Sequence, residues 1–163
     1  MGTRGLLVLG MGSVLVLGTP AFAQQPAPKP DYGAPITNEQ AKAAAGAALA
    51  EAKKNNWRMA ISIVGPAGDL VYFEKMDGVQ LASIEISQGK ARTAVRFRVP
   101  SKVFADQYAA GNLVFTTFPE KPVASEGGIP IVVNDRIIGA IGVSGGTGQQ
   151  DGAAANAGAT AVK

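Results

Sequence analysis

The sequence contains no histidine and no cysteine among its 163 residues. Histidine is the commonest metal ligand and the only side chain that titrates near neutral pH at its ordinary pKa. Catalytic schemes built on Ser-His-Asp, Cys-His or a His-Glu-x-x-His zinc motif are therefore excluded. Without cysteine no disulfide can form, so stability must come from packing or from oligomerisation. Any chemistry must rest on carboxylates, lysine, hydroxyl groups, backbone amides or a bound cofactor.

Aromatic residues and excess charge are also scarce. Aromatics make up 6% of the chain, and the formal net charge is +3 at pH 7. The basic residues do not gather in a stripe interleaved with aromatics, so nucleic-acid binding is not expected. The apolar run Leu6 to Leu17 is interrupted by glycines and is shorter than the roughly 18 residues that a membrane-spanning helix needs.

The N-terminal segment has the layout of a secretory signal peptide. Arg4 precedes the apolar run, and Ala21-Phe22-Ala23 is a small-x-small cleavage signature. We predict that residues 1–23 are removed before Gln24, that no stable membrane span remains, and that the protein is periplasmic or secreted. A retained membrane anchor is the alternative reading of the same residues.

The rest of the chain divides into a short tether and one domain. Residues 24–35 (QQPAPKPDYGAP) are polar and rich in proline, which predicts an extended linker without contacts to a core. Residues 36–163 remain, and they are enough for one domain with its own hydrophobic core.

Helices are predicted in several parts of this domain. Thr37 with Gln40 forms a capping box at the start of an alanine-rich helix. Apolar spacing predicts a second helix, for which Ser83 is a candidate cap, and Ser101 is a candidate cap for a third. The expected helices run from Thr37 to Lys54, from Ser83 to Arg98, from Ser101 toward Ala110, and from Gln149 toward the C-terminus.

The strands are expected to pair as two hairpins. Met59, Ile61 and Ile63 alternate on one face of the first strand, and Asn134-Asp135 is a typical hairpin turn. The expected strands are Arg58–Val64 with Leu70–Met76 and Ile129–Val133 with Ile137–Val143, and Val114–Thr117 is a brief further strand. This order predicts an α+β fold with a central antiparallel sheet flanked by helices. It lacks the βαβ alternation of a parallel nucleotide-binding sheet.

The glycine-rich stretch GAIGVSGGTGQQD, residues 139–151, resembles a phosphate-binding turn only in outline. The Walker A lysine is missing, because no lysine occurs between Arg136 and Lys163, and the dinucleotide glycine spacing does not fit. Gly139 and Gly142 leave room for a helix or a second subunit to approach the backbone. The turn at residues 144–148 is either structural or holds an anion on its free amides.

Three segments together resemble one known family. "MDG", "SIEISQGKARTAVRF" and "GGIPIVVNDRIIGAIGVSGGTGQQD" are similar to the GlcG/HbpS-like family, the haem-binding or haem-degrading HbpS-type domain. The resemblance implies a profilin-like domain and ring-like homo-oligomers, often octamers. It also implies a small-molecule ligand, since some members bind haem or cobalamin-type tetrapyrroles while many have no assigned activity.

One helical face offers candidate ligand-binding residues. Lys90, Thr93 and Phe97 follow i, i+3, i+7 spacing, so a lysine can pair with a propionate while the ring packs on a macrocycle. In the alternative reading this helix is half-buried and its lysine reaches out to solvent. The amides of Ser144, Gly145 and Gly146 complete the predicted ligand-binding set.

Iron ligation and catalysis have weaker candidates. With histidine and cysteine absent, the haem-iron candidates are Tyr72, Tyr108 and Met76, with Met59 as a further methionine. An enzyme acting on a small organic acid is the alternative function, with acid–base candidates Glu85, Asp77 and Asp151 and an oxyanion held by the turn amides. A third alternative is an oligomeric scaffold without a ligand.

Overall fold

The structure is a computed structural model, and it describes residues 1–2 and 28–163. Residues 3–23 of the predicted signal peptide and residues 24–27 of the predicted linker lie outside the described residues. Within the described part, no helix is both long enough and apolar enough to cross a membrane.

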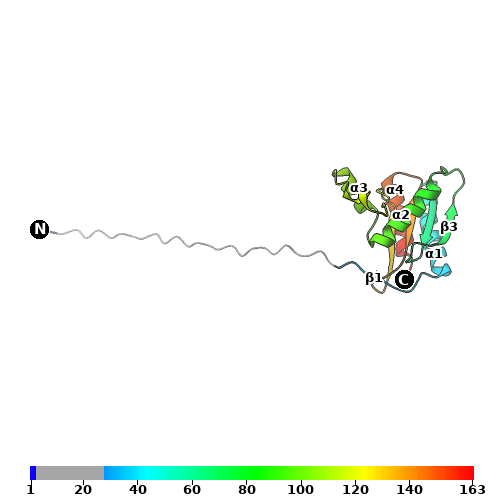
Figure 1. Ribbon diagram of the computed structural model, residues 1–163, viewed down its shortest axis with the longest axis horizontal. Coiled ribbons are helices and arrows are strands. Elements are labelled where there is room, and N and C mark those ends of the chain that lie inside the picture. The colour runs from blue at the N-terminus through cyan, green and yellow to red at the C-terminus, as the bar shows by residue number, and fades with distance from the viewer. Residues whose placement is uncertain (3–27) are drawn as a thin grey trace.

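The described residues form one five-stranded sheet around the long strand β5 (Arg136–Ser144) (Figure 1). On one side β5 pairs antiparallel with β4 (Gly128–Val133), and on the other it pairs antiparallel with β2 (Ala60–Val64). β3 (Leu70–Lys75) continues the sheet beyond β2. Asn134 and Asp135 close the β4–β5 hairpin with positive φ angles of 49° and 59°, as a tight hairpin turn requires. Both predicted hairpins are confirmed.

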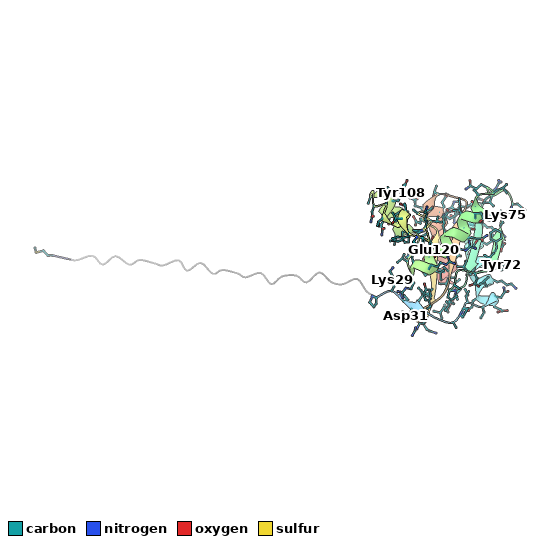
Figure 2. The ribbon with its side chains drawn as sticks, in the orientation of Figure 1. Lys29, Asp31, Tyr72, Lys75, Tyr108 and Glu120 are labelled. Carbon is teal, nitrogen blue, oxygen red and sulfur yellow. The ribbon has the colours of Figure 1, made fainter. Side chains whose placement is uncertain are left out.

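The end of the predicted tether is part of the sheet, which corrects the expectation that it makes no core contacts. β1 (Asp31–Tyr32) pairs in parallel with the start of β5, and Lys29 and Asp31 lie close against the domain (Figure 2). The Tyr32 hydroxyl donates a hydrogen bond to the Val95 carbonyl oxygen at 2.9 Å. Tyr32 is one of several anchors of this segment, since Lys29 also donates to the Phe97 carbonyl oxygen at 3.0 Å and the Gly33 amide donates to the Ile137 carbonyl oxygen at 2.9 Å. Proline-rich composition carries no sign of these contacts.

Helices cover both faces of the sheet. α1 (Asn38–Lys54) and α4 (Gly148–Thr160) pack on one face, and α2 (Ser83–Phe97) packs on the other (Figure 1). The predicted α+β class, a central sheet flanked by helices, is confirmed.

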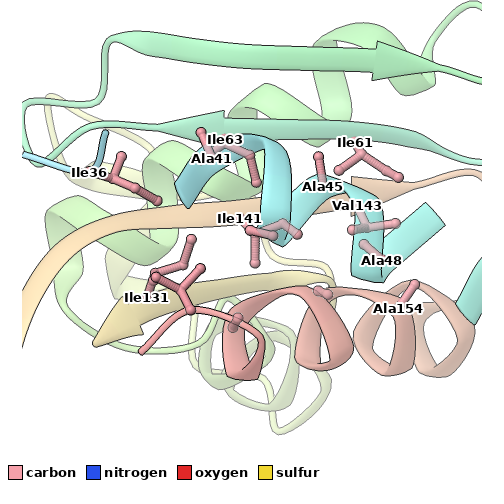
Figure 3. Packing of buried hydrophobic residues seen from close by; sticks show 14 of the residues in the cluster. Ile36, Ala41, Ala45, Ala48, Ile61, Ile63, Ile131, Ile141, Val143 and Ala154 are labelled. Atoms are coloured by element: carbon pink, nitrogen blue, oxygen red, sulfur yellow. The ribbon is translucent and has the colours of Figure 1, made fainter. Parts of the chain in front are cut away.

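The larger core lies between the sheet and the pair α1 and α4 (Figure 3). Both helices present mainly alanine to the sheet, so their backbones approach it closely while isoleucine and valine from the strands fill the space. Met59, Ile61 and Ile63 all belong to this core, as their alternation predicted. Threonine capping boxes begin both helices, at Thr37 and at Thr147, and the predicted box at Thr37 is confirmed.

Three local predictions are wrong. Val114–Thr117 is a 3-10 helix, η1, and not a strand. Ser83 does not cap α2, and Ser101 does not cap α3 (Lys102–Ala109). Each hydroxyl is buried and bonded to a distant part of the chain: Ser83 accepts from Ser144 at 3.2 Å, and Ser101 donates to the Ser125 carbonyl oxygen at 2.6 Å. Long-range bonds have replaced the local cap in both cases.

Candidate functional site

The glycine turn after β5 holds an anion, and that anion is the protein's own Asp151. The Gly146 amide donates a hydrogen bond to Asp151 Oδ1 at 2.9 Å. Thr147 caps α4, and Gln150 is its reciprocal partner in the capping box. Asp151 therefore lies in the first helical turn of α4, shortly after the glycine turn. The Gly146 amide, which was expected to be free, is therefore engaged by a carboxylate five residues further along the chain.

Lys90 reaches the same carboxylate from the other face of the sheet. Its ammonium donates to Asp151 Oδ2 at 2.7 Å and to the Val143 carbonyl oxygen at 3.1 Å. The two side chains are 1% and 4% exposed, so this is a buried ion pair. Lys90 does not extend to solvent, and a ligand could meet its ammonium only by displacing Asp151.

The pKa of Asp151 reflects these opposing influences. Burial raises the pKa of its carboxyl above the ordinary value, while the Lys90 ammonium and the amides of Gly146 and Gly145 oppose that shift. The ion pair is thus what offsets the cost of placing a carboxylate in the core.

Close backbone packing holds α2 in this position. A Cβ atom at Gly142 would collide with the Ser87 carbonyl oxygen and would lie 2.6 Å from the Ala91 amide nitrogen. The helix that approaches the small residues of β5 is therefore α2 of the same chain, which confirms the predicted close approach at Gly142. This contact sets the depth at which Lys90 enters the core.

The other predicted ligand-face residues of α2 point to different surroundings. Thr93 is buried, and its hydroxyl accepts a hydrogen bond from the Val123 amide at 2.9 Å. Phe97 is half-buried against Phe104 and Phe118, with ring centroids 4.9 and 6.2 Å away. The i, i+3, i+7 spacing thus places the three side chains on one side of the helix without bringing them to a common cavity.

Serine hydroxyls complete the polar interior near Lys90. Ser62 on β2 and Ser87 on α2 share a hydrogen bond of 2.8 Å, and the Ser144 hydroxyl donates to Ser83. Among the described residues, no buried side-chain nitrogen or oxygen lacks a hydrogen-bond partner. The polar interior is complete without a ligand.

A cavity lies elsewhere, between the C-terminal end of α1 and the end of β3. It has a volume of about 410 Å³ and shares residues with a smaller adjoining cavity of about 290 Å³. We call the two together the basic groove, lined by Leu49, Lys53, Trp57, Arg58, Lys75 and Met76. Of the residues singled out from the sequence, it contains Met76 and Asp77.

The remaining candidates are scattered. Figure 2 shows Tyr72 and Tyr108 on opposite sides of the domain, so they cannot ligate one iron within a single chain. Tyr72 donates to Glu74 at 3.2 Å, and burial together with that carboxylate raises the pKa of the tyrosine, which disfavours the phenolate. The thioether of Met76 accepts the Met59 amide at 3.4 Å.

The three acid–base candidates do not converge. Glu85 is exposed in the first turn of α2, Asp77 is exposed and lines the basic groove, and Asp151 is buried. Among residues 28–163, no three acidic side chains come close enough together to hold a metal ion.

The comparisons agree with the fold. The profile of the HbpS-like family, described as haem degrading protein HbpS-like, matches residues 36–160. Protein GlcG of Escherichia coli (strain K12) is 39% identical over 109 residues, which cover 67% of this chain and 81% of that protein. A double mutant of HbpS from Streptomyces reticuli superposes with a TM-score of 0.72 at 27% identity, covering 88% of this chain and 99% of the other. The crystal structure of a PduOC:haem complex superposes with a TM-score of 0.72 at 24% identity, covering 79% and 96%.

Proposed function

The chain belongs to the HbpS-like family, and we propose that it is an exported, homo-oligomeric binding protein for haem or another tetrapyrrole. The observation that carries the proposal within this chain is a group of exposed apolar side chains on α3, on η1 and on the residues that flank η1, one of which, Phe118, packs against the ring of Phe97. We call it the α3–η1 surface. Its exposed members are Val103, Tyr108, Leu113, Val114 and Phe118.

This surface suits a flat apolar ligand or a second subunit. Behind it lies a chain of aromatic contacts in which Phe97 packs against Phe104 and Phe118, and Phe104 packs against Phe115 at 5.5 Å between ring centroids. Exposed apolar patches of this kind mark binding or association sites. The rings supply a rigid base on which a macrocycle can stack.

The donor set fits a haem held without strong protein ligation. Tyr108 is the one iron-ligand candidate on the α3–η1 surface, with 59% of its surface exposed. Tyr72 and Met76 lie away from it, on β3 and in the basic groove. Bound haem would supply its own redox-active iron, while this chain would supply the apolar contact area. We therefore expect modest affinity.

A hemin titration of the mature protein tests this proposal. We expect a shifted Soret band that saturates near a fixed ratio of hemin to subunit, and Phe118→Ala should weaken binding about five- to tenfold through lost stacking. Leu70→Ala is the matched control, because Leu70 is an exposed apolar residue on β3. A titration that does not saturate would end the haem proposal.

Two further measurements separate iron ligation from stacking. If Tyr108 ligates the iron, Tyr108→Phe changes the Soret position, whereas pure stacking leaves it unchanged. Metal-free protoporphyrin IX should bind about as tightly as hemin if stacking dominates. Preference for hemin together with a Tyr108→Phe spectral change would assign the ligand.

Association and export have their own tests. Val114→Asp places a charge in the α3–η1 surface and should dissociate the oligomer on size exclusion, while Lys42→Asp on the exposed face of α1 should not. Export predicts that the protein recovered from its host begins at Gln24 by intact mass. A retained Met1 in the purified protein would contradict cleavage.

A further inference from the structure

We propose that the basic groove is a binding site for small aromatic or amphiphilic carboxylates, separate from the α3–η1 surface and independent of haem binding. Its features are three cationic side chains, an indole ring and an apolar floor around two adjoining cavities.

The cationic side chains are available for a ligand. Lys53, Arg58 and Lys75 are exposed, and none of them forms an ion pair with another described residue. Cations around one concave surface repel one another, and a bound anion relieves that repulsion. Two acidic residues, Glu74 and Asp77, also line the groove, so its three cationic side chains outnumber its carboxylates by one. The lining keeps an excess of positive charge.

The apolar lining sets the shape of the ligand. Trp57, Leu49 and Met76 are half-buried and pack against the main core, so their positions are fixed from beneath. The indole offers a flat face for stacking, and the thioether offers a polarisable contact. A volume of about 410 Å³ lies within the range of roughly 300–1,000 Å³ that is typical of small-molecule sites.

The elements around the groove explain why these side chains meet. Lys53 lies in the last turn of α1, where the turn of residues 55–57 leads into β2, and Arg58 follows that turn directly. The Arg58 guanidinium lies over the backbone of Gly78, 2.8 Å from where a Cβ atom would stand. Lys75 closes β3. The chain segments before β2 and after β3 therefore form the two walls.

Trp57 is the only tryptophan in the chain and therefore provides an unambiguous probe. The experiment is a ¹⁵N NMR titration of the mature protein that follows the single indole N–H signal. The ligand is naphthalene-2-carboxylate, and its control is 2-naphthamide, which has the same rings without the charge. We expect a saturable shift with the carboxylate and at least about fivefold weaker binding of the amide, from the loss of the ion pairs.

A pair of matched variants locates the charge effect. Lys53→Ala/Lys75→Ala removes two positive charges from the groove, and Lys42→Ala/Lys54→Ala removes two from exposed positions of α1 outside it. We expect about fivefold or greater loss of affinity in the first and less than about twofold in the second.

The proposal is overturned by an indole signal that does not move, by equal binding of acid and amide, or by equal losses in both variant pairs. If the indole signal does not move, the role of Lys53 is limited to a favourable interaction of its charge with the negative C-terminal end of the α1 dipole. Hemin binding at the α3–η1 surface can succeed or fail without changing any of these results.

Discussion

Lys90 and Lys53 carry the same ammonium group in opposite surroundings. Lys90 is 1% exposed and bonded to Asp151 and to the Val143 carbonyl oxygen, whereas Lys53 is exposed beside a cavity and has no ionic partner among the described residues. The first lies in a segment that matches the family motif, and the second lies in an unremarkable helix end. The difference teaches that a lysine within a family motif, such as Lys90, can have a structural role. Lysines without an ionic partner, such as Lys53, can line a cavity although no motif indicates them.

The largest expected effect comes from breaking the buried pair. Asp151→Ala leaves the Lys90 ammonium in the core without a counter-charge, so unfolding should become easier by about 3–5 kcal/mol. Chemical denaturation measures this. Lys102→Ala at the exposed Lys102–Asp106 pair is the control and should change stability very little.

A double-mutant cycle sharpens the same comparison. Lys90→Met/Asp151→Leu removes both charges, and the double variant should recover most of the stability lost in either single variant. Additive losses in the cycle would show that the two groups are not coupled.

Gly142→Val should have the next largest effect. The added side chain would collide with the backbone of α2, so the free energy of unfolding should fall by about 1–3 kcal/mol or more. Because α2 belongs to the same chain, the melting temperature should fall whether or not the protein is oligomeric. An oligomer that dissociates into subunits of unchanged stability would point instead to a subunit contact at Gly142.

A smaller effect is expected at the end of the N-terminal segment. Tyr32→Phe removes the hydrogen bond to Val95 and should cost about 0.5–1.5 kcal/mol of stability. Tyr108→Phe is the control, since Tyr108 is exposed on α3. Equal stability of wild type and Tyr32→Phe would mean that the Tyr32 hydroxyl contributes nothing to the stability of the domain.

The smallest effect concerns Tyr72 at high pH. Burial and Glu74 raise the pKa of Tyr72 above its ordinary value of 10.0, so the folded state holds the phenol proton more tightly than the unfolded chain. Its contribution to stability is then complete below that value and declines as the pH rises through the folded-state pKa. The wild type should lose more stability above pH 10 than Tyr72→Phe does, and parallel curves would contradict the shift.

Sequence patterns predicted the features that local physics decides. The capping box at Thr37, the alternation of Met59, Ile61 and Ile63, and the Asn134-Asp135 hairpin each depend on residues a few positions apart. Hydrophobic periodicity and turn preferences depend on residues that are close in sequence. The order of helices and strands, and with it the α+β class, could therefore be predicted from them.

Features that depend on distant partners could not be predicted. Lys90 and Asp151 are 61 positions apart, and nothing near either residue indicates the other. Ser83 and Ser101 resemble helix caps until the long-range bonds of the fold engage their hydroxyls. The basic groove lies between the end of α1 and the end of β3. Its gathering of positive charge depends on the fold that makes these two ends neighbours, so the sequence alone does not indicate it.

One titration follows the basic groove and the surroundings of the buried Lys90–Asp151 pair in the same experiment. In two-dimensional ¹⁵N amide spectra of the protein beginning at Gln24, naphthalene-2-carboxylate should move the Trp57 indole signal to saturation. The amide signal of Gly146 should stay in place, because that amide already donates to Asp151. A saturating shift at Gly146 with a stationary Trp57 signal would contradict the account.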